Sequence, residues 1–215
     1  MTTTVYPTTP PQGNGQFSLV SVFPDKFQQG ANSLRDDVPA AIIMDVRPAM
    51  QTRFTTDAHF APYFVSGEST WPRLNKAVLP EIRRAGKDVL LSALVLDFDN
   101  PGHKPWPLGG IHAFRARLAA AAEGFPLAMA WTYFYSTLHG ARLVYVLEVP
   151  MPADQAEQKH AGLCQMFHDA GFPEIDLKTS DWPRLFRLPL VLRDGRSTFD
   201  LMNYVARDGR PTCTR

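Results

Sequence analysis

Two aspartates, Asp97 and Asp99, end a continuously apolar stretch of the chain at residues 89–98. A run of this kind is typical of a central strand that is buried on both faces. Alternate residues of a strand point to the same face, so the two carboxylates should lie side by side. Neighbouring carboxylates repel each other and lose hydration, and a divalent cation between them removes both penalties. The spacing therefore predicts a Mg²⁺ site at the end of this strand.

A plainer interpretation of the same two residues is also open. Asp99 would then only cap the turn that Asn100-Pro101-Gly102 begins, and Asp97 would be exposed to solvent. An Asp-x-Asp pattern at a strand end is common, and by itself it does not decide between a metal site and a turn.

A second candidate segment, residues 136–142, reads Ser-Thr-Leu-His-Gly-Ala-Arg and connects two apolar runs. Small residues at such a connection leave room for a phosphate beside the backbone. His139 and Arg142 would donate hydrogen bonds to its oxygens, with Ser136 at the start of the segment. The alternative is an ordinary turn followed by one exposed arginine.

A third candidate segment places Asp176 between Ile175 and Leu177, an apolar setting typical of a strand. Arg184 and Arg187 follow it, three residues apart. Arginine binds phosphate oxygens in pairs through its planar fork, so these two side chains are candidate phosphate ligands. They would otherwise be solvated surface arginines.

Several secondary-structure elements should position these candidates. The patterns predict two apolar strands joined as a hairpin, helices that flank it, and shorter elements on either side. The expected segments are a strand or helix start at 40–44, a helix within 69–85 ended by Gly86, a helix at 110–123 ended by Gly124, the hairpin strands 127–136 and 141–149, a helix capped by Asp154 that reaches about residue 170, and short strands or strand-like segments at 174–177 and 185–192. The order strand, helix, hairpin, helix, strand predicts an α+β fold of the RRM-like, split β-α-β kind, with an N-terminal α/β lobe. On the helix that follows Asp154, the 3, 4 and 7 spacings predict an apolar inner face of Ala156, His160, Leu163, Cys164 and Phe167.

Bulk composition limits the classes of protein to consider. Residues 1–16, rich in Thr, Pro and Gly, predict a disordered tail, and residues 17–215 predict one domain, with possible lobes at about 17–87 and 88–215. The net charge of +1 means that nucleic-acid affinity must come from local basic clusters. Two distant cysteines, Cys164 and Cys213, predict neither a disulfide framework nor a four-ligand zinc site. Without a long apolar run or a signal peptide, the expected location is the cytoplasm, with no membrane partner.

In order and type, the three candidate segments resemble the archaeo-eukaryotic primase superfamily, in its primase-polymerase branch of phages and plasmids. That family has an apolar strand ending in Asp-x-Asp or Asp-x-Glu, a Ser/Gly-rich hairpin ending in small-x-His and a hydrophobic-Asp strand. Many of its mobile-element members follow that Asp with an Arg-x-x-Arg-Leu-Pro-like stretch. The matching segments are 96–99, 136–142, 175–176 and 184–189, and the resemblance covers roughly residues 88–195. One departure is clear, because the small-x-His position reads Gly140-Ala141-Arg142.

The resemblance implies template-directed nucleotidyl transfer by a DNA primase or DNA polymerase of a mobile element. It implies that two Mg²⁺ or Mn²⁺ ions are held by three acids, namely Asp97, Asp99 and Asp176. It implies that the triphosphate is bound by Ser136, His139, Arg142, Lys178 and Arg187. The implied partners are a single-stranded DNA template, an NTP or dNTP, and a fused or separate replicative helicase.

Two other functions stay open on the sequence. Residues 94–100 also resemble the strand-ending Asp-x-Asp of haloacid-dehalogenase-type phosphatases, although the Gly-Thr that usually follows is missing. The chain could also be a non-catalytic nucleic-acid-binding replication module, in which Tyr133, Tyr135 and Tyr145 would stack on bases. The paired carboxylates favour an enzyme over this second alternative.

Overall fold

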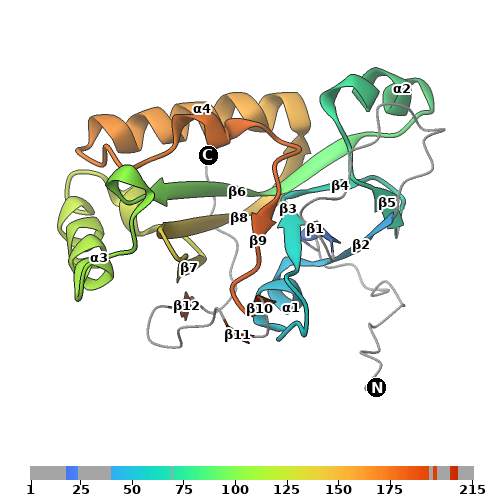
Figure 1. Cartoon of the computed structure of the whole chain (residues 1–215). Coiled ribbons are helices and arrows are strands. Elements are labelled where there is room, and N and C mark those ends of the chain that lie inside the picture. The colour runs from blue at the N-terminus through green and yellow to red at the C-terminus, as the bar shows by residue number, and fades with distance from the viewer. Residues whose placement is uncertain (1–17, 24–39, 69, 194–195, 198–203, 208–215) are drawn as a thin grey trace.

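The computed structural model describes residues 18–23, 40–68, 70–193, 196–197 and 204–207 of the chain (Figure 1). The tail predicted at residues 1–16 lies outside these described residues. Within them the fold is a mixed α/β arrangement of two five-stranded antiparallel sheets and few helices. None of the helices that the described residues form is long and apolar enough to cross a lipid bilayer.

The first sheet has the strand order β5-β2-β1-β3-β9. Its strands are β1 (Leu19–Phe23), β2 (Ala40–Asp45), β3 (His59–Ala61), β5 (Thr70–Pro72) and β9 (Phe186–Arg187). The element expected at residues 40–44 is therefore a strand, and it runs directly into the short helix α1 (Val46–Gln51). The carboxylate of Asp45 caps this helix by accepting a hydrogen bond from the backbone N–H of Arg47.

The second sheet has the strand order β12-β7-β8-β6-β4 and contains the two longest strands. Its strands are β4 (Tyr63–Val65), β6 (Val89–Asp99), β7 (Tyr133–Ser136), β8 (Gly140–Pro152) and β12 (Tyr204–Ala206). The predicted hairpin is confirmed, because β7 and β8 pair in antiparallel register. At its turn, a Cβ on Gly140 would come within 1.9 Å of the carbonyl oxygen of Phe98. The close approach of β8 to the end of β6 therefore requires glycine at this position.

The two sheets exchange strands across the boundary expected near residue 87. Strand β4 precedes that boundary but pairs with β6 of the second sheet. Strand β9 follows it but pairs with β3 of the first sheet. The division into lobes at 17–87 and 88–215 stays a prediction, and each part contributes one strand to the sheet that belongs mainly to the other.

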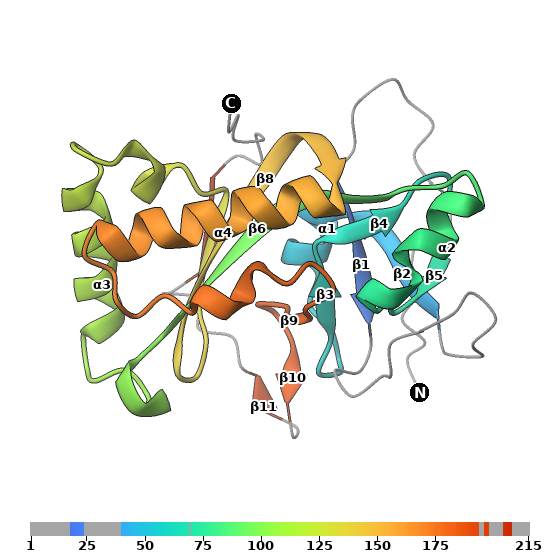
Figure 2. The same cartoon turned by 90° about the horizontal axis from the view of Figure 1, so that it is seen from above.

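One face of the second sheet is covered by helix α4 (Ala153–Asp169), which lies along β6 and β8 in Figures 1 and 2, and helix α3 (Gly110–Ala121) lies beside one end of these two strands. The ring of Phe98 reaches from β6 into this layer, with its centroid 5.0 Å from that of Phe114 and 5.6 Å from that of Phe167. The inner face predicted for α4 is confirmed, because Ala156, His160, Leu163, Cys164 and Phe167 are all buried.

The opposite face of β6 packs toward the first sheet. Val95 of β6 belongs to a second apolar cluster with Val22 of β1 and Phe60 of β3. Because both faces of β6 are covered, its sequence is apolar throughout rather than alternating. Asp97 and Asp99 continue the residue series of Val95, so they lie on the face that looks toward the first sheet.

The structure corrects four local expectations about secondary structure. Helix α4 begins at Ala153 after Pro152, so Asp154 is not its cap, and the Asp154 carboxylate instead pairs with Arg83 at 3.1 Å. The strand expected at 127–136 is extended only from Tyr133, because its start is occupied by the 3-10 helix η3 (Pro126–Met129). A proline fixes its own backbone torsion and favours the first turn of a helix, which accounts for this start.

The other two corrections concern residues 174–177 and 185–192. Residues 174–177 form only a single bridge from Ile175 to Phe98 before the 3-10 helix η4 (Leu177–Ser180) begins. The stretch 185–192 is divided into β9 and β10 (Leu192–Arg193), and β10 pairs with β11 (Arg196–Ser197). The remaining short elements are the 3-10 helices η1 (Lys76–Val78) and η2 (Pro101–His103) and the helix α2 (Leu79–Arg84), which is followed by Gly86 as expected.

Candidate functional site

Asp97 and Arg142 form a buried ion pair across the end of β6 and β8. The two residues are direct partners in the strand register. The Nε and Nη2 atoms of Arg142 each donate to one carboxylate oxygen of Asp97 at 3.1 Å, so the contact is bidentate. Burial alone would lower the pKa of Arg142, but the Asp97 carboxylate and the Tyr135 hydroxyl outweigh it and the pKa is raised. Asp97 is only 8% exposed, which rules out the interpretation of a solvated residue.

Arg142 also ties the second sheet to the first. Its Nη1 atom donates to the backbone carbonyl of Arg187 in β9 at 3.1 Å. The hydroxyl of Tyr135 donates to the same carbonyl at 2.9 Å. The Arg142 guanidinium further lies 5.5 Å from the ring centre of Phe186. The position of this side chain is therefore fixed from both sheets.

Asp99 lies two residues further along β6 and is more accessible, with its side chain 36% exposed. Burial raises the pKa of this carboxyl, and the charges of Asp97 and Asp176 raise it further, while His103 and Arg142 lower it. The Nδ1 atom of His103 lies 3.6 Å from the Asp99 carboxylate. A carboxylate in such a negative environment is stabilised by a nearby cation.

Asp176 comes to the same place through backbone pairing. Its N–H donates to the carbonyl of Asp97 at 2.9 Å, and the N–H of Asp99 donates to the carbonyl of Glu174 at 2.8 Å. One carboxylate oxygen of Asp176 accepts from the backbone N–H of Lys178 at 2.9 Å, and the other accepts from Arg184 at 3.1 Å. The structure thus brings the three predicted acids, Asp97, Asp99 and Asp176, together at one end of β6; we call them the acidic end.

The acidic end fits a divalent cation in its chemistry but is not arranged around one. Carboxylate oxygens are the ligands that Mg²⁺ and Mn²⁺ prefer. Across the described part of the chain, however, no three acidic, histidine or cysteine side chains are gathered as ligands of one ion. The reason is visible in the contacts, because Asp97 is held by Arg142 and Asp176 by Arg184. A cation would have to compete with these two arginines.

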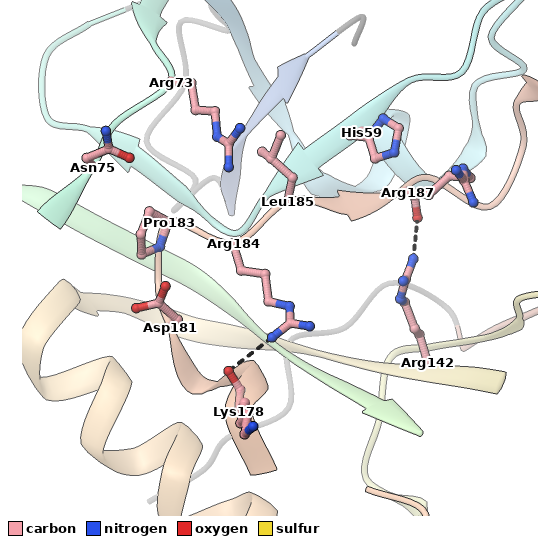
Figure 3. Close-up of a pocket in the computed structure, with 10 residues that line it drawn as sticks. All are labelled: His59, Arg73, Asn75, Arg142, Lys178, Asp181, Pro183, Arg184, Leu185 and Arg187. Carbon is pink, nitrogen blue, oxygen red and sulfur yellow. Dashed lines mark hydrogen bonds between the residues drawn. The ribbon is translucent and has the colours of Figure 1, made fainter. Parts of the chain in front are cut away.

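A cavity of about 520 Å³ lies next to the acidic end, between the first sheet and the segment that leads into β9 (Figure 3). It is lined by His59, Arg73, Asn75, Arg142, Lys178, Asp181, Pro183, Arg184, Leu185 and Arg187. Four arginines and one lysine therefore face a single aspartate, and we call this cavity the cationic pocket. Its size and charge suit a ligand with several negative charges, such as a di- or triphosphate group.

The cationic pocket shares a wall with the acidic end. A second hollow, of about 690 Å³, is lined by Asp99, Asp176 and Glu174 together with the loop at residues 100–103. Lys178 and Arg184 line both cavities. A ligand that crosses this shared wall would contact arginines on one side and carboxylates on the other.

The residues predicted as phosphate ligands fall into two groups. Arg142, Lys178 and Arg187 line the cationic pocket. Ser136 and His139 line neither of the two cavities. Ser136 follows the inward-facing Tyr135 in β7, so strand alternation directs it to the opposite face of the sheet. For these two residues a role in phosphate binding stays a prediction.

Sequence reasoning missed the contribution of the first sheet. His59 of β3 and Arg73, just after β5, line the cationic pocket, and Asp57 pairs with Arg187 at 2.6 Å. No local pattern around these residues predicted a site, because His59 and Arg73 are isolated polar residues between apolar neighbours and Asp57 only follows two threonines. The pairing of β3 with β9 sets His59 opposite Arg187 and so brings it to the pocket, whereas Arg73 reaches the pocket from the end of β5.

The tyrosines considered for base stacking are not available for it. Tyr133, Tyr135 and Tyr145 are each no more than 3% exposed and belong to the apolar clusters on the two faces of the sheet. Stacking on single-stranded nucleic acid needs aromatic rings that are open to solvent. These side chains therefore serve the core.

Comparison with known proteins gives one remote likeness. No protein-family model matches the chain, and no curated protein matches it. Among solved structures, the fold is similar to that of the AEP domain of the primase-polymerase of cyanophage S-2L. The TM-score is 0.39 at 13% sequence identity, over 71% of this chain and 85% of that chain. At this level the likeness assigns neither a family nor an activity to the chain.

Proposed function

We propose that this chain is a nucleotidyltransferase of the primase-polymerase kind, which adds an NTP or dNTP to a growing strand on a single-stranded DNA template. One observation carries the proposal: the acidic end and the cationic pocket share the wall formed by Lys178 and Arg184. Nucleotidyl transfer needs carboxylates for divalent cations beside positive groups for the triphosphate. Neither half alone would distinguish this chemistry from simple anion or cation binding.

The chain order of the second half is compatible with the split β-α-β core expected for such an enzyme. Strand β6, helix α3, the β7-β8 hairpin and helix α4 follow one another, and Ile175 then returns to the edge of β6. This order would correspond to an RRM-like core in which the last strand is reduced to one bridge. We propose it as the frame of the catalytic domain at residues 17–215.

In the proposed reaction the 3′-oxygen of the growing strand attacks the α-phosphorus of the incoming nucleotide. A new phosphorus–oxygen bond forms, the bond between the α-phosphorus and the bridging oxygen breaks, and pyrophosphate leaves. The hydroxyl proton passes to solvent. Arg142, Arg184 and Arg187, with Lys178, would neutralise the triphosphate and the charge that gathers on the leaving pyrophosphate.

The proposed divalent ions, Mg²⁺ or Mn²⁺, would be held by Asp97, Asp99 and Asp176. When bound there, they would lower the pKa of the 3′-hydroxyl and offset negative charge on pyrophosphate. Asp99 is the carboxylate best prepared for this role, because burial and the charges of Asp97 and Asp176 raise its pKa, and a bound cation would offset both effects. Asp97 and Asp176 would first have to loosen their contacts with Arg142 and Arg184. A replicative helicase, fused or separate, is the protein partner that this function would need.

Primer extension tests the proposal directly. The purified chain is expected to extend a labelled primer on a single-stranded DNA template with NTP or dNTP, in the presence of Mg²⁺ or Mn²⁺. The Asp99→Asn variant should lose at least about a hundredfold in rate, because one charged ligand is removed without a change in size. Asp169→Asn is the matched control, since that residue ends α4 and lines neither cavity.

The outcome is decisive in both directions. A wild-type chain that incorporates neither kind of nucleotide with either ion, on primed and unprimed templates, contradicts the proposed function. Full activity of a soluble Asp99→Asn variant would leave polymerisation standing but remove the metal assignment at this position.

A further inference from the structure

His59 is a buried histidine that lines the cationic pocket without belonging to any motif of the sequence. It lies in β3, where it is the direct strand partner of Arg187, and only 3% of it is exposed. Figure 3 places its ring on the first-sheet side of the pocket, near Arg187. Its Nδ1 atom is buried and has no hydrogen-bond partner among the described residues. A buried polar atom without a partner is rare and costs stability, so it calls for a functional explanation.

The charged groups around His59 come from three segments. Asp57 lies two residues before it, just ahead of β3, Arg187 lies opposite on β9, and Arg142 projects from β8. Burial, the largest influence, lowers the pKa of His59 to about 4. The Asp57 charge and a hydrogen bond with the Asp57 backbone act in the opposite direction, and the charges of Arg187 and Arg142 add to the lowering. The imidazole is therefore neutral at physiological pH.

A phosphate ligand would oppose the lowering of the His59 pKa by burial. Phosphate oxygens that pair with Arg142 and Arg187 would cancel the two positive charges that disfavour protonation of His59. They would also add negative charge and hydrogen-bond acceptors at the pocket wall, which stabilise an imidazolium. Asp57 is already in place to support that charge.

We propose that His59 is a phosphate-binding residue that takes up a proton when a di- or triphosphate group enters the cationic pocket. The inference rests on the proposed function for the identity of the ligand, and it adds a residue of the first sheet to the site. In the ligand-free protein His59 is neutral. In the complex it is an imidazolium that donates to a phosphate oxygen, and the proton comes from solvent.

The pH dependence of ligand affinity follows from the direction in which the pKa of His59 changes. Because this pKa is higher in the complex than in the free protein, the protein binds the ligand more tightly as the pH falls through the pKa of the complex. The affinity stops rising below the pKa of the free protein, which is about 4. If the pKa of His59 in the complex reaches the ordinary histidine pKa of about 6.5, His59 takes up more than half a proton at pH 6.

Calorimetric titration with inorganic pyrophosphate, without divalent metal, measures this uptake. Heats recorded at pH 6 in two buffers of different ionisation enthalpy give the number of protons bound. The wild type is expected to take up at least about half a proton more than His59→Asn, and to bind about fivefold more tightly. His168→Asn is the matched control, because that histidine is exposed on α4 and lines neither cavity.

A second measurement does not depend on a variant that folds. Long-range ¹H–¹⁵N spectra of the wild type report the charge of each histidine ring, and the His59 signals should change to those of an imidazolium as pyrophosphate is added at pH 6. Equal proton uptake by wild type and His59→Asn, or a ring that stays neutral, overturns the inference and leaves nucleotidyl transfer intact. Absence of pyrophosphate binding to the wild type overturns the inference together with the phosphate-binding half of the proposed function.

Discussion

The acidic end and the cationic pocket are built in different ways. Asp97, Asp99 and Asp176 are placed by main-chain hydrogen bonds between β6 and the segment at residues 174–176. The cationic pocket is formed by side chains from both sheets, and carboxylates hold three of its arginines in position. The three ion pairs are Arg142 with Asp97, Arg184 with Asp176 and Arg187 with Asp57.

The acidic end and the cationic pocket depend on each other. In the ligand-free chain each of these arginines already has a carboxylate as its partner, so the acids occupy the places that phosphates would take. A phosphate ligand that draws Arg142 and Arg184 toward itself releases Asp97 and Asp176 for a cation. The acidic end should therefore bind a cation, and the cationic pocket a phosphate ligand, cooperatively rather than independently.

The largest expected effect separates two acids of the acidic end. Asp97→Asn leaves the guanidinium of Arg142 buried without its counter-charge, which should lower the free energy of unfolding by about 3 kcal/mol. Asp99→Asn should leave that free energy nearly unchanged, because its side chain is partly exposed and holds no buried partner. Urea unfolding of both variants measures the contrast. Equal losses of stability would mean that the pair of Asp97 and Arg142 is not a distinct structural contact.

A smaller effect is expected on substrate binding when the cationic pocket is changed. Arg142→Ala should raise the nucleotide KM by about tenfold or more, because one charge-assisted contact with phosphate is lost. Arg142→Lys should recover only part of this loss, since the planar fork is missing. Steady-state kinetics at saturating template decide the point. A KM within about twofold of wild type in a folded Arg142→Ala variant would show that the arginine does not bind the nucleotide.

The smallest expected effect is the coupling between cation binding at the acidic end and nucleotide binding in the cationic pocket. Mn²⁺ affinity, measured by the loss of the free-ion electron paramagnetic resonance signal, should rise about fivefold when a non-hydrolysable nucleotide is present. Arg184→Gln should raise the affinity for Mn²⁺ alone, because Asp176 is then released from its partner. Since the nucleotide can bind Mn²⁺ itself, the Asp99→Asn variant with the same nucleotide is the necessary reference. Equal Mn²⁺ affinity with and without nucleotide, after that correction, would contradict the exchange of partners.

The acidic end could be predicted from sequence because its determinants are local. The apolar run of β6 identified a strand buried on both faces, and the spacing of Asp97 and Asp99 set both carboxylates on one side of it. Asp176 was predicted from its apolar neighbours, although the expected strand proved to be one bridge followed by a turn that its own carboxylate stabilises. The arginine partners of Asp97 and Asp176 were not predicted, because strand register and a side-chain contact set them.

The cationic pocket could be predicted only in part. Arg142, Lys178 and Arg187 were identified from short motifs, whereas His59 and Arg73 come from a sheet whose strand order no local pattern specifies. Pairing of β3 with β9 joins segments that are far apart in the sequence. The strand exchange between the two sheets, with β4 and β9 on the far side of the expected boundary, was likewise not visible in composition or periodicity.

The same pairing has a consequence for how the chain folds during synthesis. The ion pair of Asp57 and Arg187 joins residues that are 130 positions apart in sequence. Closing so long a loop costs entropy that early, local contacts such as the β7-β8 hairpin do not, so contacts of this kind form late. While the ribosome is still making the chain, the acidic residues of β6 can already be in a strand, but the pocket that receives the phosphates is completed only after β9 has emerged. The nascent chain therefore acquires its capacity to bind phosphates later than it forms the strand that carries Asp97 and Asp99.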